Sequence, residues 1–433
     1  MKKNLFFTFV FVISISVFAE QWPLEKCIDY ALKHSKTIRS HIETIVADSA
    51  KIIQAKSVFY PNLSAGANAS TSGTPFDNAS DPAGVISMRL SSGITLFDGR
   101  KNTNRLSIAE ASLRQNKFFL DVSQRDIVSQ TARNYISVLY ATETLKNADD
   151  AVLLSQKQIE YQQALSEVGK ATPLALTKSN AQLSKNKHLE TVAQNNLNSA
   201  ILQIKQLLEL DQNVNFEIVY PETDFDEIAY LVNLSADSIY NNKFDAEKFA
   251  AQLSVEIAQI SFLIAKAGKI PTLSANASIS TDFSSRASQG LNRQKPQNTG
   301  EQLTNNLSPS VGLSLNIPIV DNRVTKSSII TAQSNLNKAE ISLEATQQNV
   351  RFQIEQLIAD IKAASARFSS ASEQFLSETE NMQMIEEMYK LGNVTVIDYA
   401  SQQNNFLSAQ SELTQAKYSL MLSQKLLEIY LEY

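Results

Sequence analysis

The chain has very few of the residues that build disulfides, metal sites and catalytic centres. Cys27 is the only cysteine among 433 residues, so no disulfide can form within the chain. It follows Leu24-Glu25-Lys26, which are not the small residues that a lipoprotein cleavage site needs. The histidines have no metal-ligand spacing: His34, His41 and His188. With no nucleophile–base pair, phosphate loop or cofactor motif in the sequence, neither catalysis nor a cofactor is predicted.

Long apolar runs are lacking beyond the N-terminus. No later segment has about eighteen uninterrupted apolar residues, so a membrane-spanning helix is not expected. Residues 1–19 are predicted to be a secretory signal peptide, because Lys2 and Lys3 precede an apolar run that ends in Val17-Phe18-Ala19. Removing the two lysines changes the formal net charge from −5 to −7 (−5 − 2), which does not suggest a nucleic-acid partner. The predicted location is beyond the inner membrane of a double-membraned bacterium.

Two stretches of the chain, 98–169 and 321–392, repeat each other without an internal proline. Apolar residues recur every seven positions in both: Leu106, Leu113, Leu120 and Ile127, then Ile329, Leu336, Leu343 and Val350. The offset between partners is constant (329 − 106 = 223), and it also relates Asp98-Gly99-Arg100 to Asp321-Asn322-Arg323. A sevenfold spacing is typical of coiled-coil helices, here roughly 100 Å long at about 1.5 Å per residue. The chain is therefore predicted to be a tandem duplication.

Each unit is predicted to contain a helix, two strands, the long helix and a returning helix. Helical periodicity from Leu24 to Tyr60 ends at Pro61, and alternation with a period of two then predicts strands over 62–70 and 86–96. The matching strands of the second unit are 273–279 and 311–319, separated by an exposed loop over 281–306. Thr172-Pro173 is a good start for a helix that returns over 172–210. The predicted boundaries are 20–210 for the first repeat, 211–242 for a linker and 243–433 for the second repeat.

The strands and helices together predict an oligomer. Four strands are too few to close a barrel. An open sheet cannot lie in lipid either, because its edge N–H and C=O groups would be unpaired. Several chains must therefore share one barrel. Polar residues of the first hairpin, such as Gln182, Asn186 and Gln194, indicate that one helical face meets water. The expected fold is a mixed α and β membrane protein, an oligomeric duct that crosses the outer membrane as β-strands and the periplasm as α-helices.

In these features the chain resembles the TolC-type outer-membrane efflux protein family. The residues that carry the resemblance are the repeated Pro-x-Leu-Ser-Ala strand openings, the sequence Leu96-Phe97-Asp98-Gly99-Arg100 with its partner Ile319-Val320-Asp321-Asn322-Arg323, and the segment Gly392-x-x-Thr395-x-x-Asp398. The resemblance implies a homotrimer with a shared β-barrel in outer-membrane lipid and a periplasmic α-barrel. It also implies a periplasmic adaptor protein bound to an inner-membrane transporter of the RND, ABC or MFS type. The duct itself would be a passive exit for tripartite efflux or type I secretion, and not an enzyme.

The resemblance also implies a gate where the helices reverse. Asp398 falls on an acidic position of the family's periplasmic constriction, and Tyr389 falls on a tyrosine that helps to latch it. Three Asp398 carboxylates would converge in a trimer and favour cations. Gly169 with Thr172, and Gly392 with Thr395, mark the two reversals, which in the family also dock on the adaptor.

Other interpretations stay open at this point. Asp398 also fits a capping box with Thr395, and Tyr389 also fits a packed helix aromatic. The chain departs from the family pattern at Ser401, where a second acidic residue is common, and at Val394, where a basic latch residue is expected. For the whole protein, the alternative is an extended periplasmic coiled-coil scaffold without transport activity, against which the four strands of bilayer length argue.

Overall fold

A computed structural model describes residues 20–72, 83–168, 172–211, 213–214, 216–220, 231, 234–242, 245–285 and 298–432. The signal peptide predicted over 1–19 lies outside these residues. The chain divides into two compact units. We call Met1–Arg39, Asp121–Phe244 and Arg351–Tyr433 the helical unit, and Ser40–Leu120 with Asp245–Val350 the sheet unit. Two long helices, α3 (Lys101–Glu167) and α10 (Val324–Lys390), contribute residues to both units.

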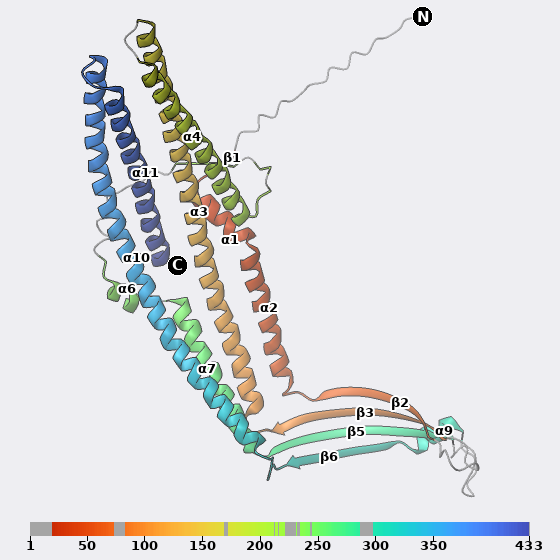
Figure 1. Cartoon of the computed structure of the whole chain (residues 1–433). Coiled ribbons are helices and arrows are strands. Elements are labelled where there is room, and N and C mark those ends of the chain that lie inside the picture. Colours follow the sequence, from red (N-terminus) through yellow and green to blue (C-terminus); the bar gives the residue numbers. More distant parts are fainter. Residues whose placement is uncertain are drawn as a thin grey trace, which may run out of the picture. The chain divides into compact units, whose positions relative to one another are not determined.

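The sheet unit contains one antiparallel sheet in the order β2-β3-β5-β6 (Figure 1). Its strands are β2 (Asn62–Ser72), β3 (Ala83–Phe97), β5 (Thr272–Ser284) and β6 (Ser308–Asn316). The four strands predicted from alternation are confirmed, and the central β3–β5 pair joins the two repeats. One boundary prediction is wrong, because β6 ends at Asn316 and not at Ile319. Pro318 has no N–H to donate to a neighbouring strand.

The two faces of the sheet differ in chemistry. Residues that lie opposite each other in antiparallel strands share a face. One row across the four strands is apolar: Ala65, Leu90, Ile279 and Pro309. The next row consists of serines: Ser64, Ser91, Ser278 and Ser310. The hydroxyl oxygens are 2.9 Å apart in both the Ser64–Ser91 and the Ser278–Ser310 pair.

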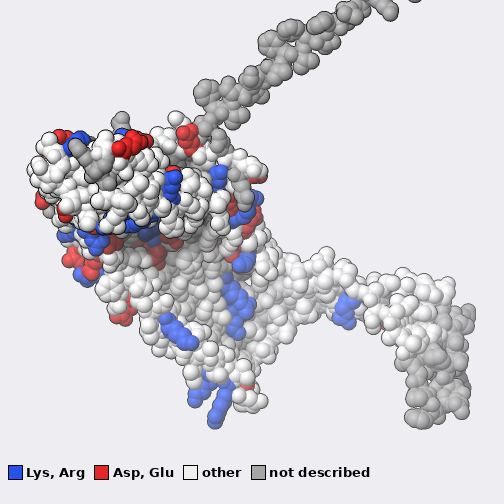
Figure 2. All heavy atoms as spheres, turned by 45° about the horizontal axis from the view of Figure 1, so that its top comes forward, with Lys and Arg blue, Asp and Glu red and all other residues white. Residues whose placement is uncertain are grey.

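Charged side chains are nearly absent from the sheet. In the four described strands only Arg89 and Asp282 are charged. Figure 2 shows the same contrast on one face of the molecule, where blue and red side chains gather on the helices and the strands are almost entirely white. The sheet therefore has one apolar face and one face of small, neutral polar groups.

Helix α7 (Ala246–Lys266) packs on the first part of α3 within the sheet unit. Arg114 Nη2 lies 2.9 Å from Glu256 Oε1, and Gln115 Nε2 donates to the Ala250 carbonyl oxygen (3.0 Å) and to Ser254 Oγ. Among the described helices, Ala246–Lys269 is the one segment long and apolar enough to cross a membrane, with a mean hydropathy of 1.2. The segment meets this criterion of length and composition although its apolar sequence contains charged residues and glutamines. Its polar groups are used in the contact with α3.

The helical unit contains α4 (Pro173–Leu207), α11 (Val396–Glu432) and the later parts of α3 and α10. Both long helices have 67 residues, about 100 Å at 1.5 Å per residue, as the sevenfold pattern predicts. A short parallel pair, β1 (Glu20–Trp22) with β4 (Phe216–Ile218), also belongs to this unit, as do α1 (Leu24–His34) and α6 (Ala236–Asn242). Tyr135, which is buried, donates its hydroxyl proton to the Val219 carbonyl oxygen (2.5 Å), and the Trp22 carbonyl oxygen lies 3.2 Å away, so Tyr135 holds one end of this pair.

One predicted helix and one predicted loop need correction. The helix predicted over Leu24–Tyr60 is two helices, α1 (Leu24–His34) and α2 (Lys36–Ser57), separated by Ser35. Ser35 has extended backbone and its Oγ accepts from the Ile38 N–H (3.4 Å), so it ends α1 and caps α2. The loop predicted over 281–306 begins with the end of β5 and contains α9 (Thr299–Asn305), which starts with a capping box between Asn298 and Glu301.

Asn186, expected on a water-facing helical surface, is instead buried between α3 and α4. Its Nδ2 donates to the Ala151 carbonyl oxygen (3.1 Å) and to Ser155 Oγ (2.6 Å). A buried amide is tolerated when its hydrogen bonds are made within the protein. The polar composition of the hairpin therefore serves helix packing as well as contact with water.

The two long helices begin in the same way. Asp98 Oδ2 accepts from the Asn102 N–H (2.8 Å), and Asp321 Oδ2 accepts from the Thr325 N–H (2.7 Å). The two residues after each aspartate have positive φ: Gly99 (69°) and Arg100 (68°), then Asn322 (50°) and Arg323 (71°). The repeated Asp-x-Arg sequence is therefore a repeated turn.

Gly99→Ala is expected to destabilise the protein. A Cβ at Gly99 would lie 3.0 Å from two atoms of Ile270 in a left-handed backbone, and that conformation alone costs about 1–2 kcal/mol for an L-residue. The measurement is the apparent melting temperature of the detergent-solubilised protein. Gly300→Ala is the matched control, because the new Cβ would meet only Asn298 Oδ1 at 3.6 Å. An equal melting temperature for the two variants would contradict the prediction.

Candidate functional site

The second helix reversal is closed by backbone hydrogen bonds around Gly392. Gly392 has φ of +77°, its N–H donates to the Tyr389 carbonyl oxygen (3.0 Å), and the Asn393 N–H donates to the Met388 carbonyl oxygen (2.9 Å). This pair of bonds is the Schellman motif that ends many helices. Gly392 is therefore a turn glycine, as the sequence predicts, and its surroundings are open because no heavy atom lies within 4 Å of a built Cβ.

Thr395 and Asp398 form a reciprocal cap at the start of α11. The Asp398 N–H donates to Thr395 Oγ1 (3.2 Å), while Asp398 Oδ2 accepts from the Thr395 hydroxyl (2.6 Å) and from the Thr395 N–H (3.4 Å). The capping box considered from the sequence is thus formed. Asp398 nevertheless stays exposed, so its carboxylate retains access to water and to ions.

Tyr389 is packed between the helices of the hairpin and α3. It is 7% exposed, its ring stacks on Tyr399 with centroids 4.6 Å apart, and Tyr161 of α3 lies at 5.3 Å. Its hydroxyl accepts from Gln158 Nε2 (2.9 Å) and also contacts Gln162 Nε2. The packed aromatic considered from the sequence is therefore formed, and it joins α10 to α3 through aromatic contacts and hydrogen bonds.

Burial keeps the phenols of Tyr389 and Tyr399 neutral. Burial is the main cause that raises the pKa of Tyr399 to about 12, with Glu386 adding to the effect. Burial likewise raises the pKa of Tyr389, against the opposing effect of the hydrogen bond from Gln158. A neutral Tyr389 hydroxyl can accept from the two glutamines and still donate a proton of its own.

The first reversal is described only in part. Thr172 caps α4 by accepting from the Ala175 N–H (3.3 Å), and Pro173 takes the first helical position, as predicted. Gly169 lies outside the described residues. Ala175 has no carboxylate to match Asp398, so the two reversals differ in charge. In the described part of the chain no group of three or more His, Cys, Asp or Glu side chains is placed to hold a metal ion.

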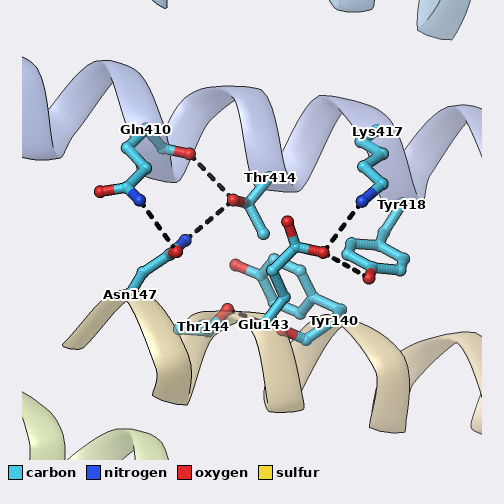
Figure 3. Close-up of polar contacts among 8 residues, drawn as sticks. All are labelled: Tyr140, Glu143, Thr144, Asn147, Gln410, Thr414, Lys417 and Tyr418. Carbon is cyan, nitrogen blue, oxygen red and sulfur yellow. Dashed lines mark hydrogen bonds and ion pairs between the residues drawn. The ribbon is translucent and has the colours of Figure 1, made fainter. Parts of the chain in front are cut away.

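A polar contact between α3 and α11, which the sequence did not predict, links the two repeats. Glu143 Oε2 accepts from the Tyr418 hydroxyl (2.6 Å) and lies 3.0 Å from Lys417 Nζ (Figure 3). About one turn of helix further, Asn147 Nδ2 donates to Thr414 Oγ1 (3.0 Å), and Asn147 Oδ1 accepts from Gln410 Nε2 (3.0 Å). We call these residues the α3–α11 contact: Glu143, Asn147, Gln410, Thr414, Lys417 and Tyr418.

The α3–α11 contact sets the charge on Glu143. Burial alone would raise the pKa of this carboxyl, but the hydrogen bonds from Tyr418 and Lys417 outweigh burial and lower it. Burial and the neighbouring Glu143 carboxylate both raise the pKa of Tyr418, which therefore remains a donor. No sequence motif marks these residues, because each is an ordinary polar side chain on a long helix and its partner lies more than 260 residues away.

Comparison with known proteins decides the family. The family model described as outer membrane efflux protein matches residues 27–209 and 249–431, once in each repeat. The chain belongs to this family. It is an outer-membrane efflux channel of the TolC type, located in the outer membrane and extending into the periplasm. It is thus a transport protein and not an enzyme, and the scaffold alternative is set aside.

Relatives of this efflux protein include the outer membrane protein TolC of Escherichia coli K12. That protein is 24% identical over 390 residues, which cover 86% of this chain and 75% of the relative. The outer membrane efflux protein BepC of Brucella suis is 21% identical over 397 residues, covering 91% of this chain and 81% of the relative.

Solved structures show the same fold as this efflux protein. The Campylobacter jejuni CmeC outer membrane channel superposes with a TM-score of 0.80 at 15% identity, covering 94% of this chain and 85% of that chain. The Vibrio cholerae outer membrane protein VceC gives a TM-score of 0.77, also at 15% identity, covering 94% and 95%. The long helices and the four antiparallel strands are therefore features that this efflux protein shares with such channels.

Glu143→Gln is expected to lower the stability of this efflux protein at neutral pH by about 1 kcal/mol, because the ion pair is lost while an acceptor for Tyr418 remains. The folded-state pKa of Glu143 is below its ordinary 4.5. Its stabilising contribution is therefore complete above pH 4.5 and is lost as the pH falls through the lowered folded-state value.

The measurement is the apparent melting temperature of wild type and variant across this pH range. The gap between them should narrow on acidification. Glu256→Gln is the control, since its pair with Arg114 is exposed and such pairs contribute little. A difference in melting temperature between wild type and Glu143→Gln that is constant with pH would contradict the lowered pKa of Glu143 and its role in stability.

Proposed function

We propose that three copies of this chain form the exit duct of a tripartite efflux pump or type I secretion system, with the sheets closed into one barrel. The observation that carries the proposal is the open four-stranded sheet. β2 and β6 are its edges, and one of its faces is apolar. Unpaired edge groups cost several kcal/mol each in lipid, so the β2 edge of one chain would pair with the β6 edge of the next.

Strand length and face chemistry support the same arrangement. The strands have 11, 15, 13 and 9 residues, and a tilted membrane strand needs about 9–11. The apolar row through Leu90 and Ile279 would face lipid, while the serine row would face a water-filled lumen. The long helices would continue the duct through the periplasm.

The gate of this duct is proposed at the second reversal. The exposed Asp398 carboxylates of three chains would form a ring that favours cations, and this role is compatible with capping because the capped side chain stays exposed. Tyr389 would act as a latch within one chain, since it bonds α10 to Gln158 and Gln162 of α3. Val394 and Ser401 supply neither a basic latch nor a second acidic ring, so the latch depends on Tyr389 and its aromatic neighbours.

The partners are proposed from the family. The reversals at Gly169–Thr172 and Gly392–Thr395 would contact a periplasmic adaptor, which joins an inner-membrane transporter of the RND, ABC or MFS type. The proposed chain organisation is a signal peptide over 1–19, repeats over 20–210 and 243–433, and a linker over 211–242. It is supported by the helix reversals, which fall at equivalent places in the two repeats.

The native mass of the protein extracted in detergent from outer membranes tests the assembly. The expected mass is close to three chains, each 47.9 kDa before removal of a signal peptide. A monomer would overturn the shared barrel, because one chain cannot pair its own sheet edges.

Single-channel conductance of the reconstituted protein tests the gate. Asp398→Asn keeps an acceptor for the cap and removes the charge, so cation preference should weaken while the melting temperature is kept. Asp398→Ala should also raise conductance. Tyr389→Phe removes the hydroxyl that accepts from Gln158 and Gln162, so it should weaken the contact between α10 and α3 and raise conductance as well.

Ser401→Ala, one turn further along α11, is the control and should behave as wild type. The gate proposal would be overturned if both Asp398 variants kept the conductance and ion selectivity of wild type. If only Asp398→Ala were then less stable, Asp398 would serve as a helix cap alone.

A further inference from the structure

A cavity of about 520 Å³ lies between α3, α4 and α11, beside the second reversal. Small-ligand sites in proteins have volumes of roughly 300–1,000 Å³. The first turns of α11 contribute Val396, Tyr399 and Ala400, while α4 contributes Lys178, Ser179 and Lys185. All three helices are in the helical unit, so the fold holds the walls together.

The cavity contains a buried amide without a partner. Gln403 is 2% exposed, and its Nε2 has no hydrogen-bond partner among the described residues. The neighbouring amides are used, since Gln158 donates to Tyr389 and Gln182 donates to Asn186 and Asn404. Gln403 lines the cavity, although its Nε2 is itself covered by the protein. A buried N–H donor is costly to leave unpaired, so turning this amide toward an acceptor bound in the cavity would be favourable.

The charge around the cavity is positive. Lys178 and Lys185 line it from the same side of α4, about two turns apart, and neither forms an ion pair with a described residue. No aspartate or glutamate is among the described residues that line it. Asp398, the carboxylate nearest along the chain, turns back to Thr395. The amino end of α11 adds its positive helix dipole to the two ammonium groups.

We propose that this cavity is a binding site for a small organic anion with an apolar body, such as an aromatic or alkyl carboxylate or sulfonate. Lys178 and Lys185 would attract the anionic group, Gln403 Nε2 would donate to one of its oxygens, and Val396, Tyr399 and Ala400 would contact the apolar body. The site does not depend on the barrel or on the gate. Since Tyr399 also stacks on Tyr389, a bound anion would contact the aromatic cluster that joins α10 to α3.

Binding of naphthalene-2-sulfonate to the detergent-solubilised full chain tests the site, with calorimetry as the measurement. We expect one probe per chain, bound about tenfold more tightly than the neutral naphthalene-2-sulfonamide, because the charged oxygens make the stronger hydrogen bonds. Lys178→Gln and Lys185→Gln should each weaken binding of the sulfonate by about three- to tenfold. Lys187→Gln makes the same charge change on an exposed part of α4 outside the cavity and should bind as wild type.

Gln403→Met separates ligand binding from simple hydration of the cavity. Methionine keeps the size and removes the unpaired amide, so the melting temperature should stay the same or rise while binding of the sulfonate weakens about tenfold. Equal affinity for sulfonate and sulfonamide would overturn the proposal. The proposal would also be overturned if Lys185→Gln and Lys187→Gln lost the same affinity for the sulfonate, because Lys185 would then not hold the anion. An unchanged affinity in Gln403→Met would overturn it too, because Gln403 would then not bond to the anion.

Discussion

The backbone N–H and C=O groups at the two open edges of the sheet set the main constraint on the assembly of this protein. Among the described strands, β2 and β6 are the edges of the sheet, and each has one side without a neighbouring strand. Water pairs such groups at a soluble surface, but lipid does not. A sheet with Leu90 and Ile279 on one face and Ser91 and Ser278 on the other is therefore suited to a closed barrel shared between chains. The duplication fits this requirement, because each repeat supplies two strands and one long helix.

The long helices are under a different constraint, because they must pack against one another while keeping many polar side chains. A continuous apolar face 67 residues long would favour aggregation in water. This chain instead pairs polar groups between helices. Glu143 bonds to Tyr418 and Lys417, and Asn186 bonds to the Ala151 carbonyl oxygen and to Ser155. Such contacts hold helices in a defined register, because a shifted helix would leave buried polar groups without partners.

At the second reversal, local and tertiary interactions have separate roles. Gly392, Thr395 and Asp398 shape the turn through bonds to residues within five positions along the chain. Tyr389 bonds to glutamines of α3 more than 220 residues away. The turn can therefore keep its shape while the hairpin as a whole moves relative to α3. The gate proposed here would need both properties, a turn held by local bonds and a contact with α3 that can be broken.

The sequence by itself determined the features that depend on near neighbours. The sevenfold spacing indicated α3 and α10, the alternation indicated four strands, and Thr395-x-x-Asp398 indicated the cap, because each pattern acts within one helix or strand. Only the tertiary structure decided that Asn186 is buried, that Glu143 lies beside Lys417, and that Gln403 Nε2 is buried without a hydrogen-bond partner among the described residues. These outcomes depend on which faces of distant helices meet. A repeated polar side chain such as glutamine or asparagine has the same local pattern whether it faces water, another helix or a cavity.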